Sequence, residues 1–326
     1  MRSKPELEAV IRERGRGRAV LVVNSRSRRG RRLFERAGRL LDEAGMVFDE
    51  IVPVPDPAKL DAVLTDVVDS RPDLVVAGGG DGTIAAAVSH LAHRDIALGV
   101  LPLGTTNNFA RSLELPLDLP GAVRVLAEGK VADVDVGWFE STGDLTDDPG
   151  GADDHEHIFA NMVSLGLSVH VAEQVPHRLK AALGRPAYAL TAVRLLPRHE
   201  AFHAKVTIDG VTREMPTHQL NIANGAHHSG QRIARDASPD DRLLAVYRLG
   251  DERRLKLASA TARHVLTGRW RSLKSEAFLT TDEVVVETDP PLSVDVDGEI
   301  RGRTPVRIRL LGNALRVIVP TSFVDT

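Results

Sequence analysis

The stretch Leu74–Thr83, LVVAGGGDGT, constrains the fold of this chain more than any other. It begins with Leu74–Ala77, a short apolar run that ends in turn residues, which is typical of a strand buried on both faces. Gly78–Gly80 allow a sharp turn and a close approach of the backbone to a ligand, because glycine has no Cβ. Ile84–Val88 then predicts a helix, and the N–H groups at a helix N-terminus can bind an anion. The stretch therefore predicts a strand, a phosphate-binding turn and a helix, although a turn without any ligand explains the same residues.

Asp81 is unusual in a turn of this kind, because a carboxylate repels phosphate. A divalent cation held by oxygen ligands would remove the conflict. The turn lacks the lysine of a P-loop, and Thr83 stands where a dinucleotide-binding turn has its last glycine. The sequence thus indicates a metal-bound phosphate that is held in a different way from either of these motifs.

Strands and helices alternate in the first part of the chain. The runs that predict strands lie at residues 19–23, 48–54, 74–77 and 96–101. Strands with helices between them form βαβ units and a mostly parallel sheet, whose ligands bind beyond the carboxyl ends of the strands. Three polar turns follow strands there: Asn24–Gly30, Gly78–Thr83 and Leu103–Asn108. We expect these turns to meet in one crevice.

The pattern changes after about residue 130. Many short apolar segments separated by turn residues follow, and they predict an antiparallel sandwich or barrel. Helices are expected at residues 169–197 and 255–267. We therefore expect an α/β nucleotide-binding domain at residues 1–134 and a β-rich domain at residues 135–313.

Composition excludes several classes of protein. The chain has no cysteine, which excludes disulfides and thiolate metal sites, and its net charge of −3 argues against a nucleic-acid partner. No apolar run approaches the ~20 residues that span a bilayer. Arginines are nevertheless concentrated between Arg12 and Arg39, which favours an anionic surface as a partner, although a solvated basic face also explains them. We expect a cytoplasmic protein that visits a membrane surface.

Several motifs, in their order and spacing, resemble the diacylglycerol kinase catalytic-domain family, soluble lipid kinases related to the sphingosine kinases. The segments that match are Asn24–Gly30 (N-P-x-S-G-x-G in the family), Gly79–Thr83 (G-G-D-G-T), Leu101–Arg111 (P-L-G-T-x-N-D-F-A-R), Asp135–Gly137 (D-x-G), Phe159–Gly166, Pro239–Leu244 and Asp297–Glu299. The resemblance covers Ala19 to Pro320, nearly the whole chain.

The resemblance implies a parallel sheet of the phosphofructokinase and NAD-kinase type, then a β-rich antiparallel sandwich, with ATP and a lipid meeting between them. It also implies that a last strand, at about residues 314–326, packs back on the first domain. Two departures matter for activity. Asn108 stands where the family usually has an aspartate, and Ala86 stands where it often has a glutamate.

The family match assigns ATP contacts to the three polar turns. The residues expected to bind ATP are Asn24, Ser27, Gly79, Gly80, Asp81, Gly82, Thr83, Gly104, Thr105 and Asn107. Phosphoryl transfer requires that the phosphates be held in place, and the N–H groups of the glycine turn can hold them. Local capping of the turns explains the same polar side chains without any ligand.

Two metal positions are expected. Asp81 would orient Mg²⁺ at the phosphates, directly or through water. Asp241, with the carbonyls of Ser238 and Leu243, would hold a structural cation, as the resemblance implies. An acidic turn without a cation is the alternative for Asp241.

An attacking alcohol must lose its proton, and a positioned carboxylate can remove it. Glu299 is the expected general base on the strength of the family match; without that match, Asp297–Glu299 is an ordinary hairpin turn. Asp135 and Asp297 are expected to support the site from behind.

The sequence therefore predicts a lipid kinase that uses ATP and Mg²⁺ to phosphorylate a hydroxyl of diacylglycerol or a related lipid. The expected partners are that lipid, an anionic membrane surface and, as an option, a second copy of the chain. One alternative is an NAD kinase, which shares the G-G-D-G turn. The other is a non-catalytic sensor of nucleotide or lipid, which Asn108 and Ala86 favour.

Overall fold

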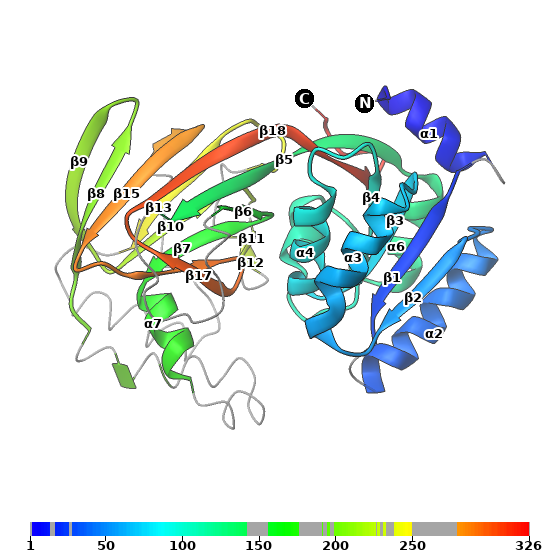
Figure 1. Cartoon of the computed structure of the whole chain (residues 1–326), viewed down its shortest axis with the longest axis horizontal. Helices are drawn as coiled ribbons and strands as arrows, with labels where there is room; N and C mark the ends of the chain where they lie inside the picture. The colour runs from blue at the N-terminus through cyan, green and yellow to red at the C-terminus, as the bar shows by residue number, and fades with distance from the viewer. Residues whose placement is uncertain are drawn as a thin grey trace.

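The computed structural model describes residues 2–13, 17–25, 28–141, 156–175, 191, 194–195, 199–225, 227–228, 231–232, 238–249 and 279–325. Two layered bodies lie side by side, an α/β body that contains the N-terminus and a β-rich body (Figure 1). Two long strands, β5 (Lys130–Ser141) and β18 (Val306–Val319), pair with each other and pass from one body into the other. The predicted class, a parallel α/β domain followed by an antiparallel sandwich, is confirmed.

A parallel sheet forms the centre of the first body, in the order β2-β1-β3-β4-β18. Its first four strands in the chain are β1 (Ala19–Asn24), β2 (Glu50–Val54), β3 (Leu74–Gly79) and β4 (Ala97–Pro102). Every residue of β3 and β4 is buried, as expected for apolar runs covered on both faces. Strand β18 pairs parallel with β4, so the last strand of the chain completes the first sheet.

Helices cover both faces of this sheet. On one face, α3 (Leu60–Asp69), α4 (Asp81–Leu91) and α5 (Asn108–Ser112) pack on the side chains of Val20, Val22, Val75 and Ala77, and the short 3₁₀ helix η1 (Pro57–Lys59) leads into α3. On the other face, α2 (Arg28–Glu43) and α6 (Leu119–Glu128) pack on Leu21, Val23, Leu74 and Val76. The alternation of side chains along each strand thus decides which helix layer each residue meets.

The N-terminal residues form a helix that the sequence analysis does not predict, α1 (Lys4–Arg12). Ser3 caps it, and Leu7 is fully buried in the core shared with α2 and α6. Arg12 donates to the carbonyl of Gly129, and Arg18 donates to the carbonyl of Ser70 at 2.9 Å. Two arginines of the basic N-terminal run therefore have structural partners.

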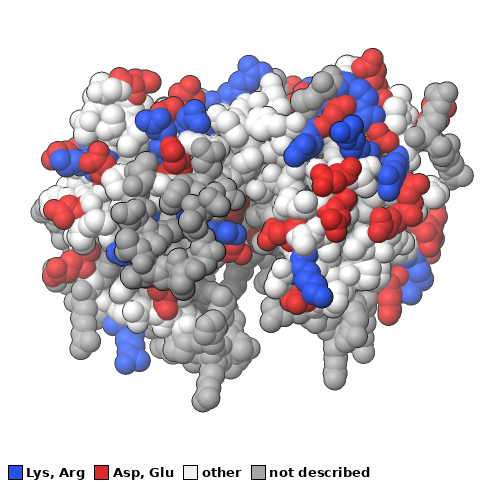
Figure 2. Space-filling view, viewed as in Figure 1, with Lys and Arg blue, Asp and Glu red and all other residues white. Residues whose placement is uncertain are grey.

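Charged side chains of both signs are interspersed over the face shown in Figure 2. At the edge of the first body, Arg2 pairs with Asp73 at 2.6 Å and with Asp95 at 2.8 Å, and Asp95 also pairs with the nearly buried Arg316 of β18 at 2.6 Å. These ion pairs fasten the start of the chain to its last strand.

Within the described residues, no helix has the length and apolarity needed to cross a bilayer.

Two antiparallel sheets form the second body. One continues the first sheet through β18, β15 and β8 to β9, and β6 joins it at β5; the other has the order β14-β13-β10-β7-β16-β17. A single apolar core fills the space between them. The strands are β6 (Glu156–Phe159), β7 (Met162–Gly166), β8 (Phe202–Ile208), β9 (Val211–Thr217), β10 (Gln219–Ala223), β13 (Leu244–Leu249), β14 (Leu279–Thr281), β15 (Glu283–Asp289), β16 (Ser293–Val296) and β17 (Glu299–Arg303).

Shorter elements complete the second body. Strand β11 (His227–His228) pairs antiparallel with β12 (Gln231–Arg232), and helix α7 (Leu167–Gln174) follows β7. Most of the helix expected at residues 169–197, and the one expected at 255–267, fall outside the described residues.

The long strand β18 begins at Val306, well before residue 314, where the last strand was expected. It is continuous, with a bulge opposite β5 between Leu311 and Leu315. Within the bulge, Asn313 has a φ of 53°, and its N–H donates to the carboxylate of Asp135 at 2.9 Å. A bulge of this kind lets one strand bend and serve two sheets without ending.

Candidate active site

The three polar turns begin at neighbouring points, because they follow parallel strands of one sheet. Asn24 ends β1, Gly79 ends β3 and Pro102 ends β4, and β3 pairs with both β1 and β4. Helix α4 starts at Asp81, directly after the glycine turn, so its free N–H groups open toward the same edge.

The second and third turns touch through their backbones. The carbonyl of Gly79 accepts hydrogen bonds from the N–H groups of Leu103, at 2.9 Å, and Gly104, at 3.1 Å. A Cβ on Gly104 would lie 2.5 Å from the Cα of Gly80, and one on Gly79 would lie 2.4 Å from the side chain of Thr83. Glycine is therefore required where these two turns approach each other.

Asp81 joins the same two turns through its side chain. Its carboxylate accepts hydrogen bonds from the hydroxyl of Thr106, from the N–H of Asn107 at 3.1 Å and from the N–H of Asn108. These donors lie at the start of α5, so Asp81 caps that helix and fixes the third turn on the second. The sequence analysis did not assign Thr106 to the site, although Thr106 lies inside the P-L-G-T-like segment.

Asn107 shapes the third turn. It takes a left-handed backbone conformation, with φ 49° and ψ 53°, which asparagine tolerates better than most residues. Its side chain accepts a hydrogen bond from the N–H of Gly104 and donates one to the carbonyl of Gly104, both at 3.0 Å. Arg111 adds a bond from its Nε to the carbonyl of Thr106 at 2.8 Å. Asn107 thus acts inside the turn in this structure.

The first turn is connected to the second by Asn24, whose Nδ2 donates to the hydroxyl of the buried Thr83 at 3.3 Å. Thr105 is exposed on the third turn, and space is open around the Cα of Gly82. Ser27 lies outside the described residues. The structure therefore brings together the expected residues of all three turns that it describes; that they bind ATP stays a prediction.

Replacing Gly104 with alanine is expected to raise the KM for ATP at least ~10-fold. The reason is that a displacement of binding groups by about 1 Å in a preorganised site can lower the reaction rate by more than this factor. The added Cβ would lie 2.5 Å from the backbone of Gly80 and 2.7 Å from Oδ1 of Asn107, so the turns must separate. Steady-state kinetics with ATP–Mg²⁺ measure the change. Gly38→Ala in α2, where a Cβ meets nothing within 4 Å, is the matched control. An unchanged KM in Gly104→Ala contradicts the expectation.

The residues present fit a magnesium ion held mainly by phosphate. Mg²⁺ usually binds one or two carboxylates, several waters and the substrate phosphates. Among the described residues, no cluster of three histidine, aspartate or glutamate side chains could hold a metal ion, so Asp81 would be a lone carboxylate of that kind. Among the described residues, its Oδ1 accepts only the N–H of Asn108, which leaves a lone pair for a metal or its water.

Asp135 is fully buried and acts as a brace between three segments. Its carboxylate accepts the N–H of Arg242 at 2.8 Å and the N–H of Asn313 at 2.9 Å, and its own N–H donates to the carbonyl of Pro239 at 2.8 Å. Asp135 therefore holds the 238–243 loop against the bulge of β18. These contacts are structural, and the expected support of the site by Asp135 stays a prediction.

The loop held by Asp135 contains the second expected metal residue, Asp241. Its carboxylate accepts the N–H groups of Ser238 and Leu243, both at 3.0 Å. Burial raises the pKa of Asp241, and these two N–H groups oppose the rise. The contacts are those of a closed acidic turn, and a cation at Asp241, Ser238 and Leu243 stays a prediction.

The hairpin between β16 and β17 carries the remaining expected residues. Asp297 accepts hydrogen bonds from the N–H groups of Ala160 at 2.6 Å and of Asn161 and Met162 at 3.0 Å each. Burial raises the pKa of Asp297, which these donors oppose. Glu299 follows with an exposed side chain that pairs with Arg301. Asp297 therefore fixes the hairpin, while the carboxylate of Glu299 stays open to solvent.

Contacts connect this hairpin to the polar turns. Beyond the start of α5, which Asp81 caps, the hydroxyl of Ser112 lies 3.4 Å from Nδ1 of His227 in the second body. A Cβ on the neighbouring Gly225 would lie 2.9 Å from that hydroxyl and 3.9 Å from Oδ1 of Asn161. Asn161 in turn donates its N–H to Asp297. The contacts thus run from Asp81 to the Asp297 hairpin in a few steps.

Asn224 lies between Asp135 and Ala160, and no sequence motif indicated it. It is fully buried, and its Nδ2 donates to the carbonyls of Asp135 at 2.9 Å and Ala160 at 3.1 Å. Its N–H also donates to the carbonyl of Asn161 at 2.9 Å. A lone asparagine after an apolar strand carries no signal by itself, because only the fold reveals which carbonyls it meets.

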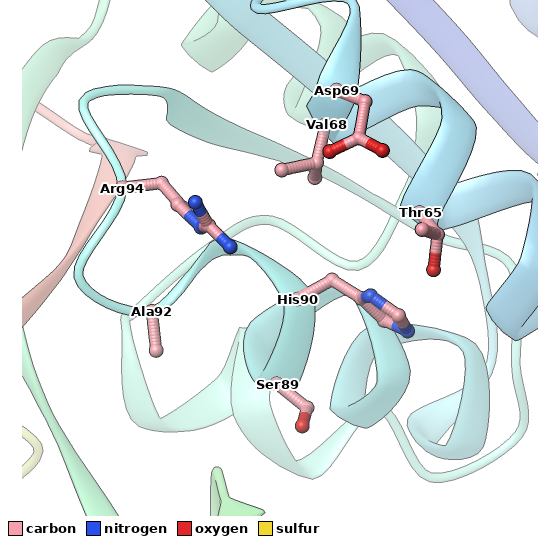
Figure 3. Close-up of a pocket in the computed structure, with 7 residues that line it drawn as sticks. All are labelled: Thr65, Val68, Asp69, Ser89, His90, Ala92 and Arg94. Atoms are coloured by element: carbon pink, nitrogen blue, oxygen red, sulfur yellow. The ribbon is translucent and has the colours of Figure 1, made fainter.

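A surface hollow of about 250 Å³ lies elsewhere, between α3 and α4 (Figure 3). The side chains that line it are Thr65, Val68, Asp69, Ser89, His90, Ala92 and Arg94. None of the residues expected at the site is among them, so this hollow is separate from the polar turns.

Asp295, on the same hairpin, yields a prediction about pH. Burial raises the pKa of Asp295 from 3.8 to about 6. The folded protein therefore binds this proton more tightly than the unfolded chain does. Below about pH 4 the carboxyl group is protonated in both states and leaves the free energy of unfolding unchanged. Above about pH 6 it is ionised in both states, and its burial lowers the free energy of unfolding by about 3 kcal/mol. Asp295→Asn is expected to raise the melting temperature at pH 8 and to leave it unchanged at pH 4. The exposed Asp282→Asn serves as control, and an equal shift of Asp295→Asn at both pH values contradicts the assignment.

Known proteins match this architecture. The family model of the diacylglycerol kinase catalytic domain matches residues 18–139, and that of the YegS C-terminal NAD kinase beta sandwich-like domain matches residues 161–319. A protein named diacylglycerol kinase from Staphylococcus aureus strain JH9 is 25% identical over 261 residues, which cover 78% of this chain and 76% of that protein. An uncharacterised protein of Synechocystis is 28% identical over 256 residues, 76% of this chain and 54% of that longer protein.

Solved structures share the fold. The crystal structure of a diacylglycerol kinase from Bacillus anthracis strain Sterne superposes with a TM-score of 0.72 at 23% identity, over 94% of this chain and 98% of that one. The two matched domains lie in the same order as the two bodies of the structure. The chain belongs to the diacylglycerol kinase catalytic-domain family of lipid kinases.

Proposed function

We propose that this protein is an ATP- and Mg²⁺-dependent kinase that transfers the γ-phosphate of ATP to a hydroxyl of diacylglycerol or a related lipid. The observation that carries the proposal is the set of contacts around Asp81, which fasten two glycine-containing turns into one preorganised edge beside the start of α4. Such an edge offers backbone N–H groups to phosphates, and phosphoryl transfer depends chiefly on holding them.

The other residues have separate roles in this proposal. Asn24, Thr105 and Gly82 lie at the edge where the nucleotide would bind. Mg²⁺, when bound, neutralises charge on the phosphates and is oriented by Asp81. Glu299 takes the proton of the attacking hydroxyl, for which its exposed carboxylate on a fixed hairpin is suited. Arg301 pairs with Glu299 on the same strand.

A panel of acceptors tests the proposal. Purified protein is incubated with [γ-³²P]ATP and Mg²⁺ and with dioctanoylglycerol, sphingosine, a monoacylglycerol or NAD, and products are separated by thin-layer chromatography. The proposal expects a phosphorylated lipid. Product from NAD alone identifies an NAD kinase, and ATP binding without any product identifies a sensor; either result rejects the proposal.

The expected membrane partner is part of the proposal. Sedimentation with vesicles of phosphatidylglycerol and of phosphatidylcholine measures it, and anionic vesicles are expected to bind more protein because basic side chains are attracted to them. The expected second copy of the chain is tested by light scattering on the purified protein.

A further inference from the structure

The surface hollow between α3 and α4 lies at the end of the first body that is opposite the polar turns. Both helices end there, at Asp69 and Leu91, just before β3 and β4 begin. Helix α4 starts beside the glycine turn, and its 11 residues rise about 16 Å along the helix axis. A molecule in the hollow would therefore leave the polar turns free.

The size and lining of the hollow limit what it can hold. Its volume of about 250 Å³ is smaller than the ~300–1,000 Å³ of pockets that take drug-sized ligands. Only Val68 and Ala92 contribute apolar side chains, and the other side chains of the lining are polar. A small polar molecule therefore suits the hollow better than a hydrocarbon chain does.

Two side chains of opposite charge line the hollow without pairing. Asp69 ends α3, and Arg94 lies in the loop between α4 and β4. Within the described residues, neither side chain forms an ion pair or a hydrogen bond. Asp95, the next residue of the same loop, instead pairs with Arg2 at 2.8 Å and with Arg316 at 2.6 Å. Asp69 and Arg94 thus keep their charges for a partner that lies between them.

The α3 side of the hollow offers acceptors. Thr65 and Asp69 are four residues apart on α3, so their side chains lie on one face of the helix (Figure 3). The hydroxyl of Thr65 donates its proton to the carbonyl of Asp61 at 3.0 Å, so it can only accept from a ligand. The C-terminus of α3 adds partial negative charge. This side therefore favours a group with a positive charge and N–H donors, such as an ammonium.

The α4 side of the hollow offers donors. Arg94 can bind a phosphate or a carboxylate with two parallel N–H groups, and the hydroxyl of Ser89 can donate to the same anion. His90, also on α4, already has a partner, because its Nε2 lies 3.3 Å from Oδ1 of Asp61. Donors on one side and acceptors on the other match a molecule that carries one charge of each sign.

We infer that the hollow binds a small zwitterion with a primary ammonium group and a phosphate or carboxylate group. Asp69 and Thr65 accept from the ammonium, while Arg94 and Ser89 bind the anion. The site goes beyond the proposed function, because no step of the phosphoryl transfer uses these residues. Free zwitterions and the headgroup of phosphatidylethanolamine share this chemistry, and binding to vesicles separates the two sources.

Titration with phosphoethanolamine tests the site. Isothermal titration calorimetry on the full chain, without ATP, gives its Kd and those of ethanolamine and inorganic phosphate, which carry one charged group each. Phosphoethanolamine is expected to bind at least ~10-fold more tightly than either, because each charged group adds hydrogen bonds of its own. Asp69→Asn and Arg94→Gln are each expected to weaken its binding about 10-fold.

The two variants also separate the two halves of the site. In Asp69→Asn, phosphoethanolamine is expected to lose its advantage over inorganic phosphate, and in Arg94→Gln it is expected to lose its advantage over ethanolamine. The matched controls are Asp66→Asn, at an exposed position of α3 outside the hollow, and Arg124→Gln, at an exposed position of α6. Both controls are expected to bind phosphoethanolamine as the parent does.

Two further measurements locate the ligand and identify its source. A saturating non-hydrolysable ATP analogue is expected to leave the Kd for phosphoethanolamine unchanged, since the length of α4 separates the hollow from the polar turns. Sedimentation with vesicles compares phosphatidylethanolamine with phosphatidylcholine, whose quaternary ammonium has no N–H to donate. Retention on phosphatidylethanolamine that is lost in Asp69→Asn assigns the lipid headgroup as the ligand, and binding of free phosphoethanolamine alone assigns a soluble zwitterion.

The inference is overturned if phosphoethanolamine fails to bind the parent, if Asp69→Asn and Arg94→Gln bind it as the controls do, or if the ATP analogue displaces it. None of these results bears on the proposed function, whose test is the transfer of phosphate to a lipid. Melting temperatures equal to those of the two controls show that both variants are folded, as expected for changes at exposed positions.

Discussion

Replacing Asp81 with asparagine is expected to lower kcat/KM for ATP by about 10²–10³-fold, the loss that follows removal of one preorganised electrostatic group from an active site. Asparagine keeps a single acceptor oxygen and places an NH₂ group opposite one of the donors at Thr106, Asn107 and Asn108. Two donors then face each other, the third turn separates from the second, and the carboxylate that would orient Mg²⁺ is lost. Phosphorylation of dioctanoylglycerol at saturating lipid measures the effect.

Two further variants make the result of Asp81→Asn interpretable. Asp66→Asn on α3 changes an exposed aspartate on a neighbouring helix and is expected to keep full activity. Thr106→Val removes only one donor to Asp81 and is expected to give an intermediate loss, because the two backbone N–H groups remain. Full activity in Asp81→Asn excludes Asp81 from the phosphate site.

Glu299→Gln is expected to reduce kcat by about 10²–10⁴-fold while the Kd for ATP is unchanged, since general-base catalysis contributes a factor of that size. Glutamine has the shape of glutamate, but it cannot accept the proton of the attacking hydroxyl. Because Glu299 is exposed and bonds only to Arg301 among the described residues, its replacement is not expected to disturb folding. Single-turnover phosphorylation and ATP titration measure the two quantities.

Glu283→Gln is the matched control for Glu299→Gln. Glu283 is another exposed glutamate on a strand of the second body, and it pairs with Arg307 at 3.7 Å. It lies on β15, which pairs with β18. If the two variants have equal kcat values, Glu299 is not the base, and the hairpin is only a turn.

Much of the first body could be predicted from the sequence. The buried strands β1, β3 and β4 are short apolar runs that end in glycine or polar turns, and this pattern is strong because parallel strands are covered on both faces. The convergence of three turns follows from topology alone, and the contacts of Asp81 confirm that the second and third turns meet. Helix α1 was missed because only Leu7 of its first two turns is fully buried, so its apolar periodicity is weak.

The roles within the site were less predictable. Asp81 was expected to orient a metal, which stays a prediction, and in the structure it caps α5; sequence spacing cannot reveal a cap between residues 81 and 108. Likewise, Asp297 and Asp135 were expected behind the site, but their partners at residues 160–162 and 313 depend on how distant strands pair. That Ser164 lies opposite both Asn221 and Asp295 depends on the register of three strands, which no single segment of sequence encodes.

The pairing of β18 with β4 has a consequence for how the chain is made. The first body lacks one strand of its own sheet until residues 316 and 317 have left the ribosome. During synthesis, β4 therefore exposes an open edge for as long as the second half is being translated. A protein truncated before residue 306 is expected to aggregate rather than to yield a separately folded amino-terminal half.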